Sequence, residues 1–482
     1  MKILPIMMKN ALILLLILVT CSCNQTNSKF NGDQKLTEIA NYLDSLEGFS
    51  GAVLIAKDDR VLFKKAYGFA HLGHKVKNNT STRFSYASIG KSFTAVSIFQ
   101  LIQSGKLSLN DPVGKFLPDY PNKLVRDSVT IRLLLTHRSG LPNYFASEKF
   151  LNTSKEQFRE IVDLAPLYEN EPLESKPNEQ FDYRNTNYIM LGRIIEVVSK
   201  MPYAQYLEKN VFSIAKMKHT GNFDSDHPIE NAAEAYTLSN VYPNQFQKTI
   251  FMSAVKGSPA GGGYTSLDDL YKFATAFKNN QLLNTKYTTL MRTEPADGSY
   301  GYGMQFAGAK GSGIYGHSGG HFGVGAEWRV FEKQNYTVIL LTNKDLDQGF
   351  LDARFFIEKT IAGSTPKLES YFFTKKVAKA CSDRGIECAK KFMTESENKL
   401  SEIDLNAKAY EMIKRGFYEK AVDLFQLEVF AFPDSYDAYD SLAEAYMMKG
   451  DTEKAIANYK KSLELNPENT NAIEKIKGLR LL

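Results

Sequence analysis

The stretch Tyr86-Ala87-Ser88-Ile89-Gly90-Lys91 decides how the rest of this chain is interpreted. A serine three residues before a lysine places both side chains on one face of a helix, because positions i and i+3 share a face. A serine hydroxyl becomes a nucleophile when a nearby base takes its proton, and a lysine in a partly dry pocket is such a base. The apolar residues that follow, from Phe93 to Ile102, predict a buried helix that holds Ser88 rigidly.

The same spacing recurs at Ser213/Lys216, Ser253/Lys256, Ser364/Lys367 and Ser396/Lys399. Context separates these pairs from Ser88 and Lys91. One of them contains Pro366, one lies in a charged stretch, and the other two do not open a long apolar helix. Only Ser88 both follows a predicted β-hairpin, formed by residues 51–57 and 60–67, and begins such a helix.

Size and composition set the frame for the fold. At 482 residues the chain is long enough for two or three domains. It is 43% hydrophobic and 23% charged, with a formal net charge of +5. The basic residues are dispersed, so we expect no nucleic-acid partner. His71 and His74 have no carboxylate or cysteine close by, which favours an exposed turn over a metal site, and we expect neither metal nor cofactor.

Residues 1–23 are predicted to be a targeting segment. A short apolar core, residues 11–19, follows two lysines and is too brief for a comfortable membrane span. Cys21 and Cys23 come directly after it, so the segment resembles a bacterial lipoprotein signal in which one of these cysteines is lipidated. We therefore expect an exported protein, periplasmic or at the cell surface and anchored by lipid to a bacterial membrane.

Cys381 and Cys388 are the other two cysteines. On one unbroken helix their Cα atoms would be roughly 10 Å apart, which is too far for a disulfide. A helix break at Gly385 would allow pairing, so both outcomes stay open at this point.

A second group of polar residues opens another predicted helix. The stretch Phe181-Asp182-Tyr183-Arg184-Asn185 leads into an apolar pattern at residues 188–198, and a loop entering a helix presents Tyr183 and Asn185 on one side. The alternative is a buried tyrosine with Asn185 as a helix cap. His137 ends another apolar run, and we interpret it as a structural histidine that holds a loop in place, in preference to a catalytic base.

Residues 316–321, Gly-His-Ser-Gly-Gly-His, match the G-x-S-x-G pattern of α/β-hydrolases. That fold needs a helix directly after Ser318 and a histidine well downstream. Residues 323–331 instead predict a strand, and His321 is the only later histidine. The pattern therefore favours a strand edge that carries His317 over an α/β-hydrolase turn, and its glycines would let the backbone come close to a substrate.

The C-terminal part repeats itself with a period of 34 residues. The residues Gly416, Ala421, Phe425 and Pro433 recur as Gly450, Ala455, Tyr459 and Pro467. This period and these residue types are typical of tetratricopeptide repeats, which are pairs of helices. We assign residues 405–482 to an all-α repeat domain and residues 363–404 to a helical connector.

Taken in order, the Ser88/Lys91 pair, the Tyr183/Asn185 pair and His317-Ser318-Gly319 resemble the serine β-lactamase and penicillin-binding-protein superfamily. The closest resemblance is to class C β-lactamases and their DD-peptidase and esterase relatives, and it covers residues 35–362. The resemblance implies an α+β fold in which helices cover an antiparallel sheet. A mostly helical subdomain would lie beside the sheet, with the cleft between them.

The resemblance also implies roles for individual residues. Ser88 would be the nucleophile, and Lys91 with Tyr183 the base system. Asn185 would hold Lys91 and the substrate amide. The predicted site also comprises the substrate-binding residues His317, Ser318 and Gly319, and an oxyanion hole made by the backbone N–H groups of Ser88 and Gly320.

The chain departs from the β-lactamases of the superfamily at two positions. His317-Ser318-Gly319 stands where those enzymes usually have Lys-Thr-Gly, and a neutral histidine offers less to a substrate carboxylate. This lowers our expectation of efficient β-lactam hydrolysis. Arg184 replaces a small residue, where it would restore positive charge at the rim or point to solvent.

The expected function is hydrolysis of a peptide, amide or ester through a Ser88 acyl-enzyme, as in D-alanyl-D-alanine carboxypeptidases or esterases. The alternative is a non-catalytic protein that binds cell-wall peptide and recruits a protein partner through its repeats. The repeats would otherwise serve as a cap on the hydrolase domain.

Overall fold

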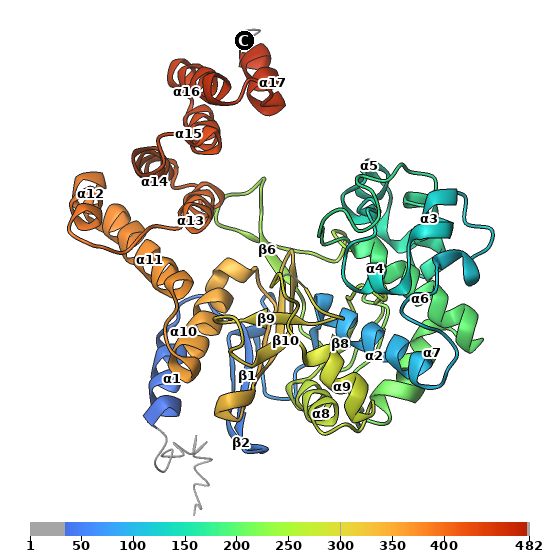
Figure 1. Cartoon of the computed structure of the whole chain (residues 1–482). Helices are drawn as coiled ribbons and strands as arrows, with labels where there is room; N and C mark the ends of the chain where they lie inside the picture. The colour runs from blue at the N-terminus through green and yellow to red at the C-terminus, as the bar shows by residue number, and fades with distance from the viewer. Residues whose placement is uncertain (1–33, 299, 480–482) are drawn as a thin grey trace, which may run out of the picture.

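The computed structural model describes residues 34–298 and 300–479. The predicted targeting segment, with Cys21 and Cys23, lies outside these residues, so export and lipid anchoring stay predictions. A six-stranded antiparallel sheet in the order β2-β1-β12-β11-β10-β9 forms the centre of the larger unit (Figure 1). Its strands are β1 (Gly51–Lys57), β2 (Arg60–Tyr67), β9 (Gln305–Ala307), β10 (Ile314–His321), β11 (Val324–Phe331) and β12 (Tyr336–Thr342).

The hairpin of β1 and β2 forms at the predicted residues. Asp58 and Asp59 make its turn with φ values of 49° and 59°, and a two-residue turn of this kind needs positive φ at both positions. Along β1, Val53 and Ile55 pack on one face of the sheet and Leu54 packs on the other, and all three are fully buried. A strand that is apolar on both faces requires a covering layer on each side.

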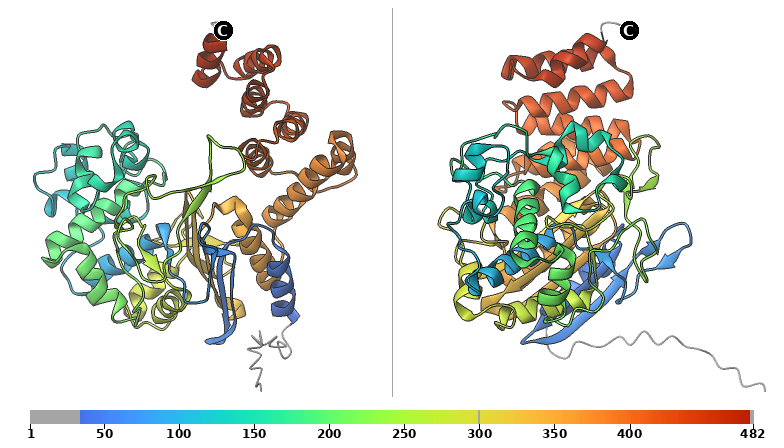
Figure 2. Two further views of the ribbon diagram at one scale, coloured as in Figure 1. Left: turned by 180° about the vertical axis from the view of Figure 1, so that it is seen from behind. Right: turned by 90° about the vertical axis from the view of Figure 1, so that its right-hand side faces the viewer.

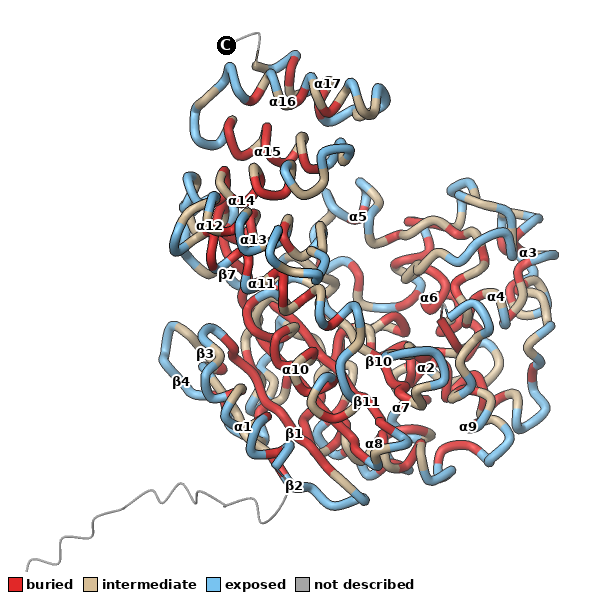
Figure 3. The backbone as a smooth tube through the Cα atoms, turned by 60° about the vertical axis from the view of Figure 1, so that its left-hand side comes forward, coloured by how far each residue is buried: buried red, intermediate tan, exposed pale blue. Residues whose placement is uncertain are grey.

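Helices supply both layers, and buried residues run along the strands and the helices that cover them (Figure 3). On one face lie α1 (Gln34–Ser45) and α10 (Leu351–Ala362). On the other lies α8 (Leu267–Lys278), with α2 (Gly90–Gln103) packed against it through Phe93 and Phe273, whose ring centroids are 4.7 Å apart. Ser266 caps the N-terminus of α8, where its hydroxyl accepts the backbone N–H of Asp269 at 3.3 Å.

A mostly helical subdomain stands beside the sheet (Figure 1). It contains α3 (Lys123–Ser128), α4 (Ile131–Leu135), α5 (Glu148–Asn152), α6 (Asn185–Ser199) and α7 (Tyr203–Leu207). The remaining short elements of this unit are β3 (Phe69–His71), β4 (Val76–Lys77), β5 (Phe84–Ser85), β6 (Tyr236–Leu238), β7 (Phe246–Lys248), β8 (Tyr264–Thr265) and α9 (Thr285–Arg292). The predicted α+β class, a helix-covered antiparallel sheet with a helical subdomain, is confirmed.

The C-terminal helices form a second unit that extends away from the sheet (Figure 2). They are α11 (Pro366–Arg384), α12 (Ile386–Thr394), α13 (Glu402–Lys414), α14 (Tyr418–Ala431), α15 (Tyr436–Lys449), α16 (Thr452–Leu465) and α17 (Thr470–Leu479). Residues of α11 and α12, such as Val377 and Ala389, belong to the same apolar core as those of the paired helices α13 to α17. The helices of the predicted connector therefore pack as part of the repeat unit.

Two groups of contacts join the repeat unit to the sheet unit. Near α10, the Tyr371 hydroxyl donates to Asp352 at 2.9 Å, and Lys375 pairs with the same carboxylate. The β6–β7 hairpin reaches up to α13 (Figure 1), where the backbone N–H of Asn244 donates to the Lys414 carbonyl at 3.0 Å. The first repeat helix is thus anchored to the sheet unit.

Both cysteines in the described part of the chain, Cys381 on α11 and Cys388 on α12, are free thiols. Gly385 ends α11 with a φ of 87°, so the break that would permit pairing is present, but it does not bring about a disulfide. Among the helices that the structure describes, none is long and apolar enough to cross a membrane.

Candidate active site

Ser88 lies in a single helical turn, η1 (Ala87–Ile89), directly before α2. Ala87, the residue before it, has a φ of 44°, a left-handed conformation that is uncommon for a residue with a side chain. The glycine-rich loop packs on this turn so closely that a Cβ at Gly261 would lie 2.0 Å from the Ala87 carbonyl oxygen. The close approach of two backbones therefore requires a glycine at position 261, within the stretch Ala260-Gly261-Gly262-Gly263.

Lys91 contacts Ser88 as the helical spacing predicts. Its Nζ lies 3.1 Å from Ser88 Oγ, 2.8 Å from Asn185 Oδ1 and 2.8 Å from the Ala260 carbonyl oxygen. The side chain is fully buried, and this burial holds the Lys91 pKa well below its usual value. A neutral amine has two N–H donors, enough for the two carbonyl-type oxygens, and one lone pair, which is then left for the Ser88 proton.

Tyr183 adjoins the same pair. Its ring centroid is 4.8 Å from Lys91 Nζ. Burial raises the Tyr183 pKa, and the hydrogen bond with Ser88 opposes that shift only in part. The phenol consequently keeps its proton at neutral pH, which suits Tyr183 to passing a proton on. Lys91, whose pKa is lowered by burial, is the better suited of the two groups to accept the proton of the Ser88 hydroxyl.

His137 positions the loop that carries Tyr183. Its Nδ1 accepts the Arg184 backbone N–H at 3.1 Å, and its backbone oxygen accepts the Asp182 N–H at 2.9 Å. The imidazole stacks on the Tyr183 ring at a centroid distance of 4.3 Å. Burial holds the His137 pKa well below its usual value. These contacts agree with the structural role predicted for His137.

His317 lies behind the catalytic residues and does not line their pocket. It is fully buried, with Nδ1 2.6 Å from the Ser318 carbonyl oxygen and Nε2 2.7 Å from the Tyr300 hydroxyl. Because a carbonyl only accepts, Nδ1 carries the proton and Nε2 accepts from Tyr300. Burial also lowers the pKa of His317, so the ring is neutral. The expectation that His317 meets substrate directly differs from this arrangement, in which both ring nitrogens are used inside the protein.

The next residues of β10 face the nucleophile. The Ser318 backbone N–H and hydroxyl both donate to Gln305 Oε1, at 3.0 and 2.8 Å. Since N–H groups alternate in direction along a strand, Gly320 points its N–H to the same side as Ser318, away from β11. A Cβ at Gly319 would lie 2.3 Å from the Ser88 nitrogen. This strand edge is therefore placed to serve with Ser88 as an oxyanion hole, which stays a prediction.

A pocket of about 90 Å³ lies over these groups and is lined by Ser88, Asn185 and Gly320 among others. Several residues that the sequence did not single out also take part. Ala260 supplies a carbonyl to Lys91, Gln305 binds Ser318, and Tyr300 binds His317. No sequence signal marked Ala260, Gln305 or Tyr300 as part of the site.

Two other sequence features are resolved by their contacts. Ser253 and Lys256, a second Ser-x-x-Lys pair, also line the pocket, but Lys256 Nζ pairs with Glu160 at 2.6 Å. That pair does not form a nucleophile and base. Arg184 is held by Glu174 at 2.5 Å and by Asp182, so it adds no unpaired positive charge at the rim.

Comparison with known proteins agrees with this geometry. Residues 39–360 match the family model described as Beta-lactamase, and residues 436–469 match a tetratricopeptide-repeat model. Penicillin-binding protein 4* of Bacillus subtilis is 29% identical over 343 residues, which cover 67% of this chain and 75% of that protein. A penicillin-binding protein from Bacillus halodurans has a crystal structure similar to this one, with a TM-score of 0.61 and 30% identity. The similarity covers 68% of this chain and 98% of that one.

The fold is shared more widely. A D-amino acid amidase from Ochrobactrum anthropi SV3 has a TM-score of 0.58 at 21% identity, covering 68% of this chain and 98% of the amidase. At this identity the likeness concerns the fold alone. The family model, in contrast, spans well over half of the chain and includes Ser88, Lys91, Tyr183 and His317. The chain therefore belongs to the β-lactamase and penicillin-binding-protein superfamily and carries a C-terminal tetratricopeptide repeat.

Proposed function

We propose that this protein is a serine acyl hydrolase that works through a covalent acyl-enzyme at Ser88. The observation that carries the proposal is the environment of Lys91, a fully buried amine with two fixed oxygen partners and its third position turned to Ser88 Oγ. Neutral and oriented in this way, Lys91 takes the hydroxyl proton as Oγ attacks the substrate carbonyl carbon.

The remaining steps use groups that adjoin Ser88. The backbone N–H groups of Ser88 and Gly320 stabilise the negative oxygen that develops in the tetrahedral intermediate. As the bond to the leaving group breaks, the proton passes from Lys91 through the Tyr183 phenol to the departing nitrogen or oxygen. A water molecule then attacks the acyl carbon, gives its proton to the same groups, and releases Ser88 with the acid product.

The charges around the pocket favour an uncharged amide or ester as substrate. His317 is neutral and faces away, and Lys256 is paired with Glu160. A substrate carboxylate would find no free cation among these residues, which argues against efficient β-lactam turnover. The similarity to penicillin-binding proteins supports a slower reaction with penicillin, or with a D-alanyl peptide, at the same serine.

The alternative of a non-catalytic peptide-binding protein has less support. A pure receptor needs no buried lysine beside a serine, and burying that amine costs stability unless its proton is lost. The repeat unit is compatible with either function, since its first helix is anchored to the hydrolase unit and its later helices extend away.

Intact-mass spectrometry of the wild-type protein and of Ser88→Ala tests the proposal. Each is incubated with a labelled penicillin and, separately, with p-nitrophenyl acetate. We expect a covalent adduct on the wild type alone and release of nitrophenol that depends on Ser88. Equal adduct formation on both proteins, or none on either together with no turnover, would overturn the assignment.

A further inference from the structure

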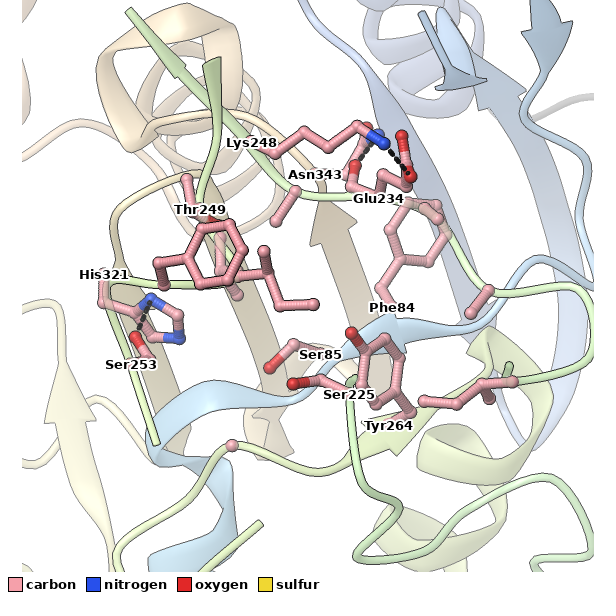
Figure 4. Close-up of a pocket in the computed structure, with 18 of the residues that line it drawn as sticks. Phe84, Ser85, Ser225, Glu234, Lys248, Thr249, Ser253, Tyr264, His321 and Asn343 are labelled. Atoms are coloured by element: carbon pink, nitrogen blue, oxygen red, sulfur yellow. Dashed lines mark hydrogen bonds and ion pairs between the residues drawn. The ribbon is translucent and has the colours of Figure 1, made fainter. Parts of the chain in front are cut away.

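A second cavity, of about 550 Å³, lies beside the catalytic pocket (Figure 4). Four residues line both spaces, namely Ser253, Ala254, Gly262 and His321. The two spaces therefore meet at these residues, within the same cleft as Ser88. A volume of this size is in the range of pockets that bind small organic groups.

The walls of the cavity combine large apolar surfaces with uncharged hydroxyl groups such as those of Ser85 and Ser225. Phe84, Ile250 and Tyr264 contribute large apolar surfaces. At the far end the Glu234 carboxylate accepts a hydrogen bond from Lys248 Nζ at 2.6 Å (Figure 4). The same carboxylate lies 3.1 Å from His71 Nε2. These ionic groups satisfy one another, so a charged ligand would lose its hydration without gaining a partner. The cavity is suited to an uncharged, apolar group.

Ser253 and His321, which line both spaces, are also uncharged where the two spaces meet. Ser253 Oγ and His321 Nδ1 are hydrogen-bonded at 3.3 Å, as Figure 4 shows. Burial lowers the pKa of His321 to about 4, so its ring is neutral at physiological pH. An apolar group can pass this point without displacing a hydrated ion.

The direction of β10 indicates which part of a substrate enters the second cavity. The proton that the leaving group needs comes from the side of Tyr183. The ring centroids of Tyr183 and Tyr300 are 5.7 Å apart, and Tyr300 binds His317 in the middle of β10. His321 is four residues further along β10, roughly 13 Å away at about 3.3 Å per residue. The leaving group thus lies toward His317, and the acyl group is directed toward His321 and the second cavity.

We propose that the cavity behind Ser253 and His321 is a specificity pocket for a bulky, uncharged, apolar acyl group. Aryl-acetyl and medium-length alkanoyl groups are the chemical class that it takes. The proposal rests on the Ser88 acyl-enzyme of the proposed function and adds the substrate class. It predicts that acylation is faster when the acyl group reaches into the cavity than when it is an acetyl group.

The test uses p-nitrophenyl esters of acetic, butyric, octanoic and phenylacetic acid with the full chain. Because the leaving group is constant, differences in kcat/KM report the acyl side alone. Ala235 lines the cavity and not the catalytic pocket, so Ala235→Phe narrows the cavity without touching Ser88. Ala309→Phe is the matched control, because Ala309 is exposed and lines neither space. Ile250→Ala makes the opposite change, because the smaller side chain enlarges the cavity.

We expect the wild type to prefer octanoyl and phenylacetyl esters to acetate. Ala235→Phe is expected to lower kcat/KM for those two esters at least about ten-fold, with a change below about three-fold for acetate. Acetate turnover in the same variant shows that it is folded. Equal losses for all esters, or no dependence on acyl size in wild type and Ile250→Ala, would overturn the pocket while leaving Ser88 catalysis intact. Absence of any Ser88 adduct would instead overturn the proposed function, and the pocket with it.

Discussion

Replacing Lys91 by methionine isolates the group on which the mechanism depends. Methionine keeps most of the length and apolar volume of the side chain but has no N–H donor and no basic lone pair. The Asn185 amide oxygen and the Ala260 carbonyl, each 2.8 Å from Nζ, lose their partner. An unsatisfied buried acceptor costs about 1–3 kcal/mol. The variant no longer has to bury a polar amine, and this gain offsets part of the cost of the two unsatisfied acceptors. We therefore expect a folded protein whose free energy of unfolding is lower by about 1–3 kcal/mol in total.

The expected loss in acylation is much larger than this change in stability. A positioned general base contributes about 10²–10⁴-fold to the rate. We expect Lys91→Met to lower the burst rate with p-nitrophenyl acetate by that factor while the circular dichroism spectrum stays native. Lys256→Met is the matched control, because Lys256 lines the same pocket but pairs with Glu160. Acylation by Lys91→Met within about three-fold of the wild-type rate would refute the role of Lys91 as base.

The pH dependence gives the same prediction an independent readout. Burial lowers the Lys91 pKa from its usual 10.5, so the amine becomes neutral in the folded state at a lower pH than in the unfolded chain. Acylation should rise with pH up to the folded pKa and then level off. Between that pKa and 10.5 the unfolded chain binds one more proton, so stability should rise with pH across this window. The difference in urea midpoint between wild type and Lys91→Met should show this slope, and a constant difference would contradict it.

Three further changes probe the surroundings. Gly261→Ala places a Cβ 2.0 Å from the Ala87 carbonyl oxygen and should lower the acylation rate about 100-fold. Gly311→Ala is the control, because Gly311 also has a positive φ but has open space around it. Equal acylation rates in the two variants would refute the packing argument. Burial raises the Glu428 pKa from 4.5 to about 8, so the folded state binds the extra proton and stability falls as pH rises through that range. Glu428→Gln should remove this fall and gain on the order of 3 kcal/mol at pH 9 in urea unfolding; an unchanged pH slope would contradict it. Arg415→Ala removes the hydrogen bond to Gln348, 2.9 Å long, and should speed hydrogen exchange in residues 346–350 without altering acetate turnover. Unchanged exchange would show that this contact does not hold that segment.

Local patterns accounted for the elements that position the nucleophile. The apolar run after Lys91 gave a buried helix, and Asp58-Asp59 between two apolar segments gave the hairpin. Such features depend on residues within one turn of helix or one hairpin, where the chain itself fixes the distance. The pairing of Ser88 with Lys91 is of this kind and was predicted correctly as a contact.

The surroundings of that pair could not be read from local patterns. The Ala260 carbonyl, the Gln305 amide and the Tyr300 hydroxyl reach the site from segments far from Ser88 in the chain. The residue types around Tyr300, and around Gln305 at the start of β9, do not indicate which distant partner each side chain will bind. The hydrogen bonds of His317 to Tyr300 and to the Ser318 carbonyl are an example, and its predicted contact with substrate stays a prediction.

The sequence by itself indicated the family, the C-terminal repeats and the contact between Ser88 and Lys91, because helical spacing, strand alternation and a period of 34 residues are properties of neighbouring residues. The tertiary structure alone decided that the first repeat helix contacts the β6–β7 hairpin, that the positive charges near the pocket are paired, and that a large apolar cavity adjoins Ser88. Cavities and charge pairs depend on how distant segments close on one another. The positions of cavities and charge pairs follow from the packing of the whole chain and cannot be predicted from the spacing of neighbouring residues.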